Sequence, residues 1–216
     1  MSLSRYPLTL GIDTTAQWCS AALVDDAKIL SFRAQKIGRG HAELLADMVQ
    51  DVLTDSGVKP TDIDKISVCI GPGSFTGLRV GLSFAKGFAL PHNIPIVGLS
   101  ALEVWAAMAD PEQNQTLCSV ADVKRGQILS QIYKNGQAVH APKLSEVNAL
   151  TKHPKTIVGG GAKLLGAQTI SNQAASAYIC PAILAWLGMR ATPETHLAEP
   201  LYHRPPDAKL PGGKTL

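Results

Sequence analysis

The most constraining feature of this sequence is a tight turn that leads directly into a helix rich in glycine and alanine. The apolar run Ile66–Ile70 is typical of a buried strand. Pro72 presets its own φ and Gly73 tolerates a positive φ, so together they predict a type II turn. Ser74 is a preferred N-cap residue and predicts a helix that runs to about Ala89. The stretch therefore predicts a strand–turn–helix unit.

Small residues recur every four positions along this predicted helix. Residues at this spacing lie on one slanted ridge, and a bulky ridge runs beside it. Each interior glycine costs about 0.5–1 kcal/mol relative to alanine, so the helix backbone is expected to lie close to a sheet, a partner helix or a ligand. The small ridge consists of Gly77, Gly81, Ala85 and Ala89, and the bulky one of Val80, Phe84 and Phe88.

The order of apolar patterns predicts an α/β chain with two related halves. The first half predicts a meander of three strands, followed by alternating helices and strands. Ser100 and Glu103 have the spacing of a capping box at the start of its last helix. The predicted strands are Leu8–Ile12, Trp18–Val24, Lys28–Ala34, Ile66–Ile70 and Ile94–Gly98, and the predicted helices are His41–Thr54, Ser74–Ala89 and Ser100–Ala109.

The second half repeats this order in a shorter form. Asn135-Gly136 predicts a hairpin turn, and Pro181 stands where a helix start tolerates proline. The polar segment Asp110–Gln115 separates the halves, so we expect a first lobe at residues 1–109 and a smaller second lobe, with an irregular tail, at 110–216. The predicted strands are Leu117–Val123, Ile128–Tyr133, a short strand after the hairpin and Thr156–Gly161, and the predicted helices are Leu144–Thr151 and Pro181–Met189.

Composition and spacing argue against several classes of protein. The net charge of +3 is too weak to indicate nucleic-acid binding by itself. The four cysteines are far apart and lack zinc-ligand spacing, so we expect reduced thiols at Cys19, Cys69, Cys118 and Cys180. No run reaches transmembrane length and the N-terminus lacks the apolar segment of a signal peptide, so we expect a cytoplasmic protein.

The glycine-rich turn does not match either nucleotide-loop pattern. A Walker loop needs a lysine after its last glycine, and a dinucleotide fingerprint needs a third glycine that Gly77 misses by one position. Free amides at the helix N-terminus could still hold an anion, so Gly71, Gly73 and Ser74 are candidate ligand residues beside the simpler reading of a structural turn. Ser74 has no Gly-x-Ser-x-Gly context and is expected to act as a helix cap.

Asp13, Thr14 and Thr15 form a second candidate ligand site at the end of the first predicted strand. They could orient a phosphate or a metal-bound water, or they could form an Asx-type turn between strands. Lys124-Arg125 at a hairpin tip reads as a solvated turn, with contact to RNA phosphate as the alternative.

Several motifs occur in an order that closely resembles one family, the bacterial TsaB (YeaZ) proteins. The block Gly71–Gly81 is the most specific of them. The resemblance covers the chain from about Leu8 to Arg204, although members usually read Tyr-Leu-Arg where this chain has Tyr202-His203-Arg204. The motifs are Ile12–Thr15, His41–Leu45, Gly71–Gly81, Ala85–Gly87, Ser100–Glu103, Asp122–Gly126 and Pro200–Arg204.

The resemblance implies an actin-like ATPase (ASKHA, ribonuclease H-like) fold with two lobes, each a mixed sheet flanked by helices. It implies a role in making N6-threonylcarbamoyladenosine at position 37 of tRNAs that read ANN codons. TsaB-type proteins are non-catalytic partners of TsaD, and TsaE joins the complex. On this reading the chain contacts tRNA only indirectly and no membrane, and it forms a homodimer when TsaD is absent.

The resemblance also implies that this chain is not itself an enzyme. TsaD-type proteins carry a His-x-x-x-His metal pair where this chain has Ala101 and Trp105, neither of which binds a transition metal. Thr14 replaces the glycine that usually follows the phosphate-loop aspartate, Asp13. We therefore expect no metal and no cofactor of its own, with ATP or ADP held only at the boundary with the partner.

The expected contact surface with TsaD lies on the first and second predicted helices, because small residues allow close approach and bulky ones supply buried area. A common interface buries about 800 Å² per partner, which two such helices could provide. The predicted interface residues are His41, Glu43, Leu44, Leu45, Met48, Phe75, Thr76, Gly77, Arg79, Val80, Gly81, Phe84 and Ala85.

Two alternatives from other classes remain open at this point. An ASKHA-type small-molecule kinase would need catalytic carboxylates in a cleft, for which Asp13 and Asp122 are the candidates. A peptidase of the M22 (glycoprotease) type would need the metal pair that Ala101 and Trp105 replace. Release of phosphate from ATP would separate the kinase from the scaffold.

Overall fold

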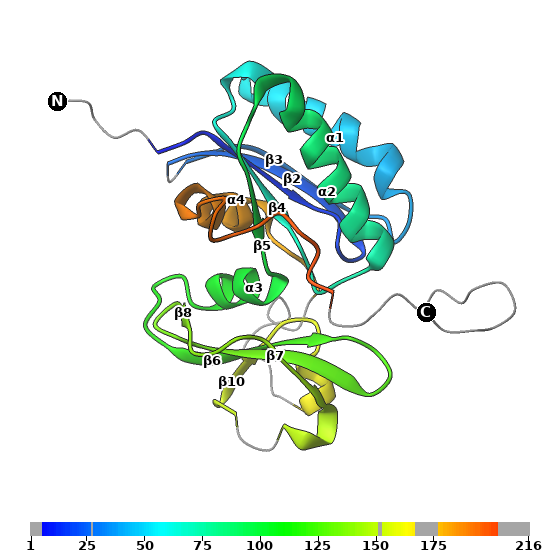
Figure 1. The fold of residues 1–216 in the computed structure, drawn as a ribbon, viewed down its shortest axis with the longest axis vertical. Helices are drawn as coiled ribbons and strands as arrows, with labels where there is room; N and C mark the ends of the chain where they lie inside the picture. Colours follow the sequence, from blue (N-terminus) through cyan, green and yellow to red (C-terminus); the bar gives the residue numbers. More distant parts are fainter. Residues whose placement is uncertain (1–5, 27, 151–152, 167–176, 203–216) are drawn as a thin grey trace, which may run out of the picture.

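The computed structural model describes residues 6–26, 28–150, 153–166 and 177–202. Two sheets lie one above the other, each with helices packed against it, and the chain passes between them more than once (Figure 1). None of the helices in the described ranges combines the length and the apolar composition that a bilayer crossing requires.

The first sheet has the strand order β3-β2-β1-β4-β5. Its first three strands form an antiparallel meander, and β4 and β5 extend the sheet in parallel from β1. This confirms the predicted meander and the predicted actin-like lobe. The strands are β1 (Thr9–Asp13), β2 (Trp18–Asp25), β3 (Lys28–Lys36), β4 (Lys65–Cys69) and β5 (Ile96–Leu99).

The second sheet repeats this plan with a divided third strand. β6 pairs antiparallel with β7 and parallel with β10, while β8 and β9 pair with different parts of β7. The strands are β6 (Thr116–Asp122), β7 (Gln127–Lys134), β8 (Gln137–Ala138), β9 (Lys143–Glu146) and β10 (Thr156–Val158).

The predicted helix Leu144–Thr151 is wrong. Lys143–Glu146 is the strand β9, and only a single 3₁₀ turn follows, at Val147–Ala149. Tertiary pairing decides this segment, because Leu144 lies beside Leu129 of β7 and a strand gains its hydrogen bonds from that neighbour. Thr151 lies outside the described residues.

Each of two helices packs on the sheet formed by the other half of the chain. α3 (Ala101–Ala109) follows the first sheet in sequence, yet its buried side chains share a core with β6 and β7 of the second. α4 (Pro181–Arg190) follows the second sheet, yet it packs on β1, β2 and β4 of the first. The lobe boundary between residues 109 and 110 stays a prediction, and each lobe depends on a helix from the other side of it.

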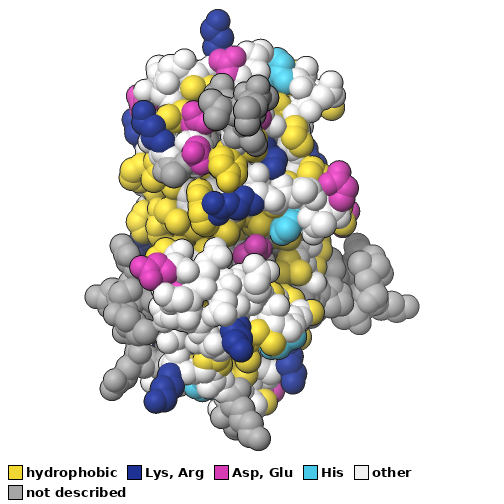
Figure 2. Space-filling view, turned by 90° about the vertical axis from the view of Figure 1, so that its left-hand side faces the viewer, with side chains coloured by type: hydrophobic (Ala, Val, Ile, Leu, Met, Phe, Trp, Pro, Cys, Tyr) yellow, Lys and Arg dark blue, Asp and Glu magenta, His cyan; other side chains and the backbone are white. Residues whose placement is uncertain are grey.

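Glycines allow α4 to lie directly on the first sheet. A Cβ atom on Gly11 would come within 2.3 Å of the Pro181 carbonyl oxygen, and one on Gly188 within 2.4 Å of the Ser67 side chain. Ser67 Oγ donates to the Leu184 carbonyl at 2.8 Å. Figure 2 views the molecule from the left-hand side of Figure 1, the side on which α4 lies, and shows hydrophobic side chains gathered on the first lobe.

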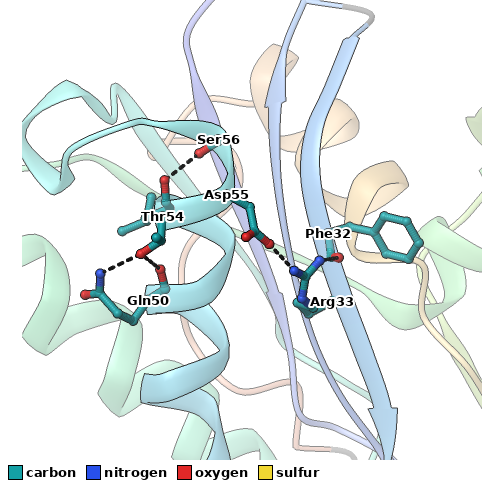
Figure 3. A network of polar contacts seen from close by, with 7 residues as sticks. Phe32, Arg33, Gln50, Thr54, Asp55 and Ser56 are labelled. Atoms are coloured by element: carbon teal, nitrogen blue, oxygen red, sulfur yellow. Dashed lines mark hydrogen bonds and ion pairs between the residues drawn. The ribbon is translucent and has the colours of Figure 1, made fainter.

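The opposite face of the first sheet is covered by α1 (His41–Ser56) and α2 (Phe75–Ala89). Leu45, Val49 and Val52 of α1 are almost fully buried there, as the apolar stripe predicted. At the rim of the sheet, Arg33 of β3 forms an ion pair with Asp55 of α1 (Figure 3).

The turn before α2 differs from the predicted type II turn. The positive φ of +99° lies at Gly71, whereas Gly73 has an ordinary φ. Gly73 is required for another reason, because a Cβ atom there would lie 2.3 Å from the Thr15 carbonyl oxygen. Ser74 caps α2 as predicted, since its Oγ accepts from the Gly77 amide at 3.3 Å.

The small ridge of α2 packs inside the lobe. A Cβ atom on Gly77 would lie 2.0 Å from the Thr14 carbonyl oxygen, and one on Gly81 would lie 2.6 Å from Thr14 Oγ1. Ala85 and Ala89 are buried against the sheet. Of the three neighbours considered from the sequence, the sheet and its first turn are the ones that require these small residues.

We expect Gly77→Ala to lower the free energy of unfolding by about 2 kcal/mol or more, because the new methyl group overlaps a backbone oxygen that cannot move alone. Gly87→Ala in the same helix is the matched control, since nothing lies within 4 Å of its Cβ position. The control should raise stability by about 0.5–1 kcal/mol. Urea unfolding of both variants measures this, and an equal effect of the two would contradict the packing argument.

Candidate functional site

A cleft of about 1360 Å³ opens between the two lobes. Three elements of the first lobe reach it: the β1–β2 turn, the segment before α1 and the start of α2. From the second lobe, the β6–β7 turn faces them. Its lining includes Thr15, His41, Gly73, Ser74, Asp122, Lys124 and Arg125.

Asp13 lies fully buried beneath the cleft at the end of β1. Its Oδ1 accepts hydrogen bonds from the Thr15 amide at 3.0 Å and from Thr15 Oγ1 at 2.6 Å, which is the predicted Asx-type turn. Its Oδ2 has no partner among the described residues. His41 Nε2, at the start of α1, is likewise buried without a partner there.

Burial raises the pKa of Asp13 from 3.8 to about 6. Hydrogen bonds from Thr15, the neighbouring Cys69 thiol and the charge of His41 lower this pKa but do not outweigh desolvation. Burial also raises the pKa of the neighbouring Cys69 thiol, and the charge of Asp13 adds to that effect. Cys69 is therefore a protonated structural thiol, as are the buried Cys19 and Cys118.

The structure divides the six candidate ligand residues into two groups. Thr15, Gly73 and Ser74 line the cleft, whereas Asp13, Thr14 and Gly71 are buried and do not line it. Thr14 Oγ1 donates to the Gly77 carbonyl at 2.7 Å, and the Gly71 carbonyl accepts from the Ala101 amide at 2.7 Å. Anion binding at this turn stays a prediction.

The β6–β7 turn presents two cations to the cleft from an unusual backbone. Lys124, Arg125 and Gly126 have successive φ values of 67°, 59° and 73°, in the left-handed region. Asp122 holds the turn through Oδ1, which accepts from the Lys124 amide at 2.7 Å. Partial burial would raise the pKa of Asp122, but hydrogen bonds from Lys124 and its charge lower it. Neither Lys124 nor Arg125 is a residue type that favours this region, so this run of left-handed residues could not be predicted from the sequence.

The positions of the absent metal pair are occupied by core residues. Ala101 is fully buried, and Trp105 is 6% exposed with its ring against Gly159. Trp105 Nε1 donates to the Tyr178 carbonyl at 2.9 Å. The predicted capping box forms only in part: the Ser100 hydroxyl accepts from the Leu102 amide instead of the Glu103 amide, while the Glu103 carboxylate accepts from the Ser100 backbone. Within the described ranges, no three potential metal ligands gather.

A second hollow, of about 450 Å³, lies between α1 and α2 on the outer side of the first lobe. We call it the α1–α2 groove. Phe75 is 39% exposed at its end, where its ring lies 5.3 Å from the Tyr202 ring and beneath the Arg79 guanidinium. Sequence spacing could not reveal this contact with Tyr202, which lies far along the chain. The groove is lined by Ala42, Leu45, Phe75, Thr76, Arg79, Val80, Ser83 and Phe84.

The predicted interface residues fall on both sides of these helices. Leu45, Phe75, Thr76, Arg79, Val80 and Phe84 line the groove, and Glu43 and Leu44 lie on the outer part of α1. The other five are buried in the isolated chain, and their contact with a partner stays a prediction. These are His41, Met48, Gly77, Gly81 and Ala85. Contact of the remaining residues with a partner stays a prediction.

The raised pKa of Asp13 predicts a pH dependence of stability. The folded state binds this proton more tightly than the unfolded state, so the contribution is present below about pH 4 and lost as the pH rises through about 6. The difference of about two pKa units corresponds to about 3 kcal/mol at most. Relative to Asp13→Asn, the parent chain should lose up to that much stability between pH 4 and pH 7.5.

Urea unfolding of both proteins across this pH range measures the effect, and parallel curves would contradict it. Asp122→Asn serves as the control of opposite sign, because the pKa of Asp122 is lowered. Relative to Asp122→Asn, the parent chain should gain stability as the pH rises through the acid range, because the ionised Asp122 stabilises the folded state.

Comparison with known proteins identifies the family. The chain matches the family described as "TsaD: tRNA N6-adenosine threonylcarbamoyltransferase" over residues 33–172. It is 35% identical to "tRNA threonylcarbamoyladenosine biosynthesis protein TsaB" of Escherichia coli over 59% of this chain and 55% of that protein. The protein of the same name from Bacillus subtilis is 33% identical over 59% of this chain and 56% of its own length. The match thus spans just over half the length of these relatives.

A solved structure extends the likeness of fold to almost the whole chain. A protein from Pseudomonas aeruginosa, described as having similarity to peptidase YeaZ, has a TM-score of 0.78 at 22% identity. The superposition covers 92% of this chain and 100% of that one. The solved structure shows that the fold is shared. The match over residues 33–172 shows that the chain belongs to that family, and the relatives named above that it resembles are TsaB proteins.

Proposed function

We propose that this chain is a non-catalytic scaffold and activator in the cytoplasmic complex that makes N6-threonylcarbamoyladenosine at position 37 of tRNAs reading ANN codons. It pairs with TsaD through the α1–α2 groove, and TsaE joins the pair. The observation that carries the proposal is the groove itself, an exposed and largely apolar hollow between two helices of a chain from this family.

The groove has the composition of a helix-docking surface. Leu45 forms a buried floor, Val80 and Phe84 are half-buried walls, and Phe75 is exposed at the end. Apolar and aromatic centres with a charged rim are typical of protein interfaces, and Arg79 supplies a charge at this rim. A helical face of the partner seated here could bury about 800 Å², the size of a common interface.

The core residues at Ala101 and Trp105 support a non-catalytic role. A metal pair at these positions would need open coordination sites, whereas Trp105 packs on Gly159 and donates to a backbone carbonyl. Replacement by histidine at either position would require the second lobe to repack around it. We therefore assign carbamoyl transfer to the partner and not to this chain.

We also propose that this chain holds no nucleotide of its own, and that ATP or ADP binds only at the boundary with TsaD. Asp13 and Thr14, the residues of the phosphate-loop position, are buried and bonded to Thr15 and Gly77. The chain meets tRNA only through the complex. In the absence of TsaD the same groove pairs two copies as a symmetric homodimer.

Placing a carboxylate in the α1–α2 groove should weaken the association with TsaD. We expect Val80→Glu and Phe84→Glu each to weaken it at least tenfold, because a buried unpaired carboxylate opposes docking. Val139→Glu is the control, since Val139 is 58% exposed on the second lobe, away from the groove. Size-exclusion chromatography and calorimetric titration with TsaD measure the effect, and unchanged binding by the groove variants would refute this surface.

The isolated chain should show neither carbamoyl transfer to tRNA, with or without added divalent metal, nor phosphate release from ATP with metabolite acceptors. Addition of TsaD and TsaE should produce transfer activity that falls in the groove variants. Metal-dependent transfer by the chain alone would overturn the scaffold assignment. Acceptor-dependent phosphate release that is lost in Asp122→Asn would favour the kinase instead.

A further inference from the structure

The two edge strands of the first sheet differ in what lies beside them. At the β5 edge, the segment that follows α4 lies alongside the strand, and the Gly98 amide donates to the His196 carbonyl at 2.9 Å. At the other edge, β3 pairs only with β2 among the described strands. β3 spans nine residues, from Lys28 to Lys36, which is long for an uncovered edge.

Two large apolar side chains on β3 are more than half exposed. Ile29 is 51% exposed and Phe32 is 53% exposed. They pair with Val24 and Ala22 of β2, which pack against α4, so both lie on the α4 face of the sheet. Figure 3 shows Phe32 on the opposite side of the strand from the Arg33–Asp55 pair that faces α1.

Helix α4 continues this apolar area beside the edge strand. Trp186 of α4 is half-buried, and the Arg190 guanidinium lies 3.8 Å from the centre of its ring. Figure 2 shows hydrophobic side chains gathered on this side of the first lobe. We call Ile29, Phe32, Trp186 and the outer edge of β3 the β3 patch. At its centre the Phe32 carbonyl accepts from Arg33 Nη1 at 2.9 Å, a contact that an added strand would replace. It lies on the face of the sheet opposite to the α1–α2 groove.

The charges around the β3 patch distinguish between possible occupants. Lys28 and Lys36 stand at the two ends of the strand, and Arg190 lies on α4. The exposed acids nearby are Asp26 at the β2–β3 turn and Asp55, which is paired with Arg33 on the α1 face. Antiparallel pairing of two copies centred on Phe32 would place Lys28 opposite Lys36. Like charges directly opposed across strands are destabilising, so a second copy is disfavoured. An acidic segment meets opposite charge at both ends.

We propose that the β3 patch is a docking site for an extended segment of a partner protein, apolar at its centre and acidic at its ends, which adds to the sheet as a strand beside β3. Main-chain hydrogen bonds to the outer edge of β3 supply affinity, and contacts with Ile29 and Phe32 select the apolar centre. Lys28 and Lys36 attract the acidic ends of the segment, and they repel a second copy of this chain, which would place lysine opposite lysine. This contact is independent of the proposed groove for TsaD.

A synthetic nine-residue peptide tests the proposal, with valine and threonine in its centre and two glutamates at each end. Fluorescence anisotropy should show saturable binding of this peptide to the full chain. In NMR spectra of the chain, the peptide should change chemical shifts only in β3, its neighbours and α4. A peptide with lysines in place of the glutamates should bind at least tenfold more weakly. Methylation of alternate peptide amides should remove binding, because it removes the ladder hydrogen bonds.

Variants of the chain locate the contact. Phe32→Ser should weaken binding of the glutamate peptide at least tenfold. Leu90→Ser is the matched control, because Leu90 is a 77% exposed apolar residue at the end of α2, and it should leave binding unchanged. The double variant Lys28→Glu, Lys36→Glu should reverse the preference between the two peptides. Circular dichroism and melting temperature confirm that each variant is folded.

Three outcomes would overturn the proposal: no saturable binding of the glutamate peptide, equal binding of both peptides, or a dimer of the parent chain that Phe32→Ser dissolves. Association with TsaD reports separately on the proposed function. Phe32→Ser should leave that association unchanged, and the groove variants should leave peptide binding unchanged.

Discussion

Contact between the backbone of α2 and the turn after β1 is the constraint on which the first lobe depends. Gly73 and Gly77 bring the start of the helix within reach of the Thr15 and Thr14 carbonyls, where any Cβ atom would overlap them. The Ser74 amide then donates to the Thr15 carbonyl at 2.7 Å. This contact joins the strand end, the buried Asp13 and the helix into one unit. The space above the turn, where a ligand would approach, is reduced by the same contact.

The exchange of helices between the sheets sets the shape of the cleft. Since α3 packs on the second sheet and α4 on the first, two stretches of chain cross between the lobes. Lys65 strengthens the crossing, because its Nζ donates to the Met189 and Ala191 carbonyls at the end of α4. The turns after β1 and β6 thereby face each other across the cleft. A shift of either helix would alter both the sheet it covers and this opening.

The first lobe presents different surfaces on its two faces. On one side, α1 and α2 leave a groove with an apolar floor and a rim that carries Arg79. On the other, α4 covers the middle of the sheet and leaves β3 with Ile29 and Phe32 exposed. The two surfaces are separated by the thickness of the sheet, so two partners could bind without competing for residues.

The sequence by itself determined most of the element order. Local patterns carry this information: alternation for β1 to β3, a clean stripe for α1, and cap residues at Ser74 and Ser100 whose hydrogen bonds reach only two or three residues. The family followed from motif order, because spaced turn residues are specific even where identity is low. The candidate turn Asp13–Thr15 could likewise be located, since its bonds are local.

Only the tertiary structure decided what lies on each side of these elements. The ridge of Gly77 and Gly81 could equally have met a partner, and its contact with Thr14 depends on a strand far away in sequence. β9 became a strand because β7 offered an edge, and α4 crossed to the first sheet because Gly11 and Gly188 left room for it. The raised pKa of Asp13 follows from burial by these neighbours. Such outcomes depend on contacts between distant segments, which the pattern along the chain does not encode locally.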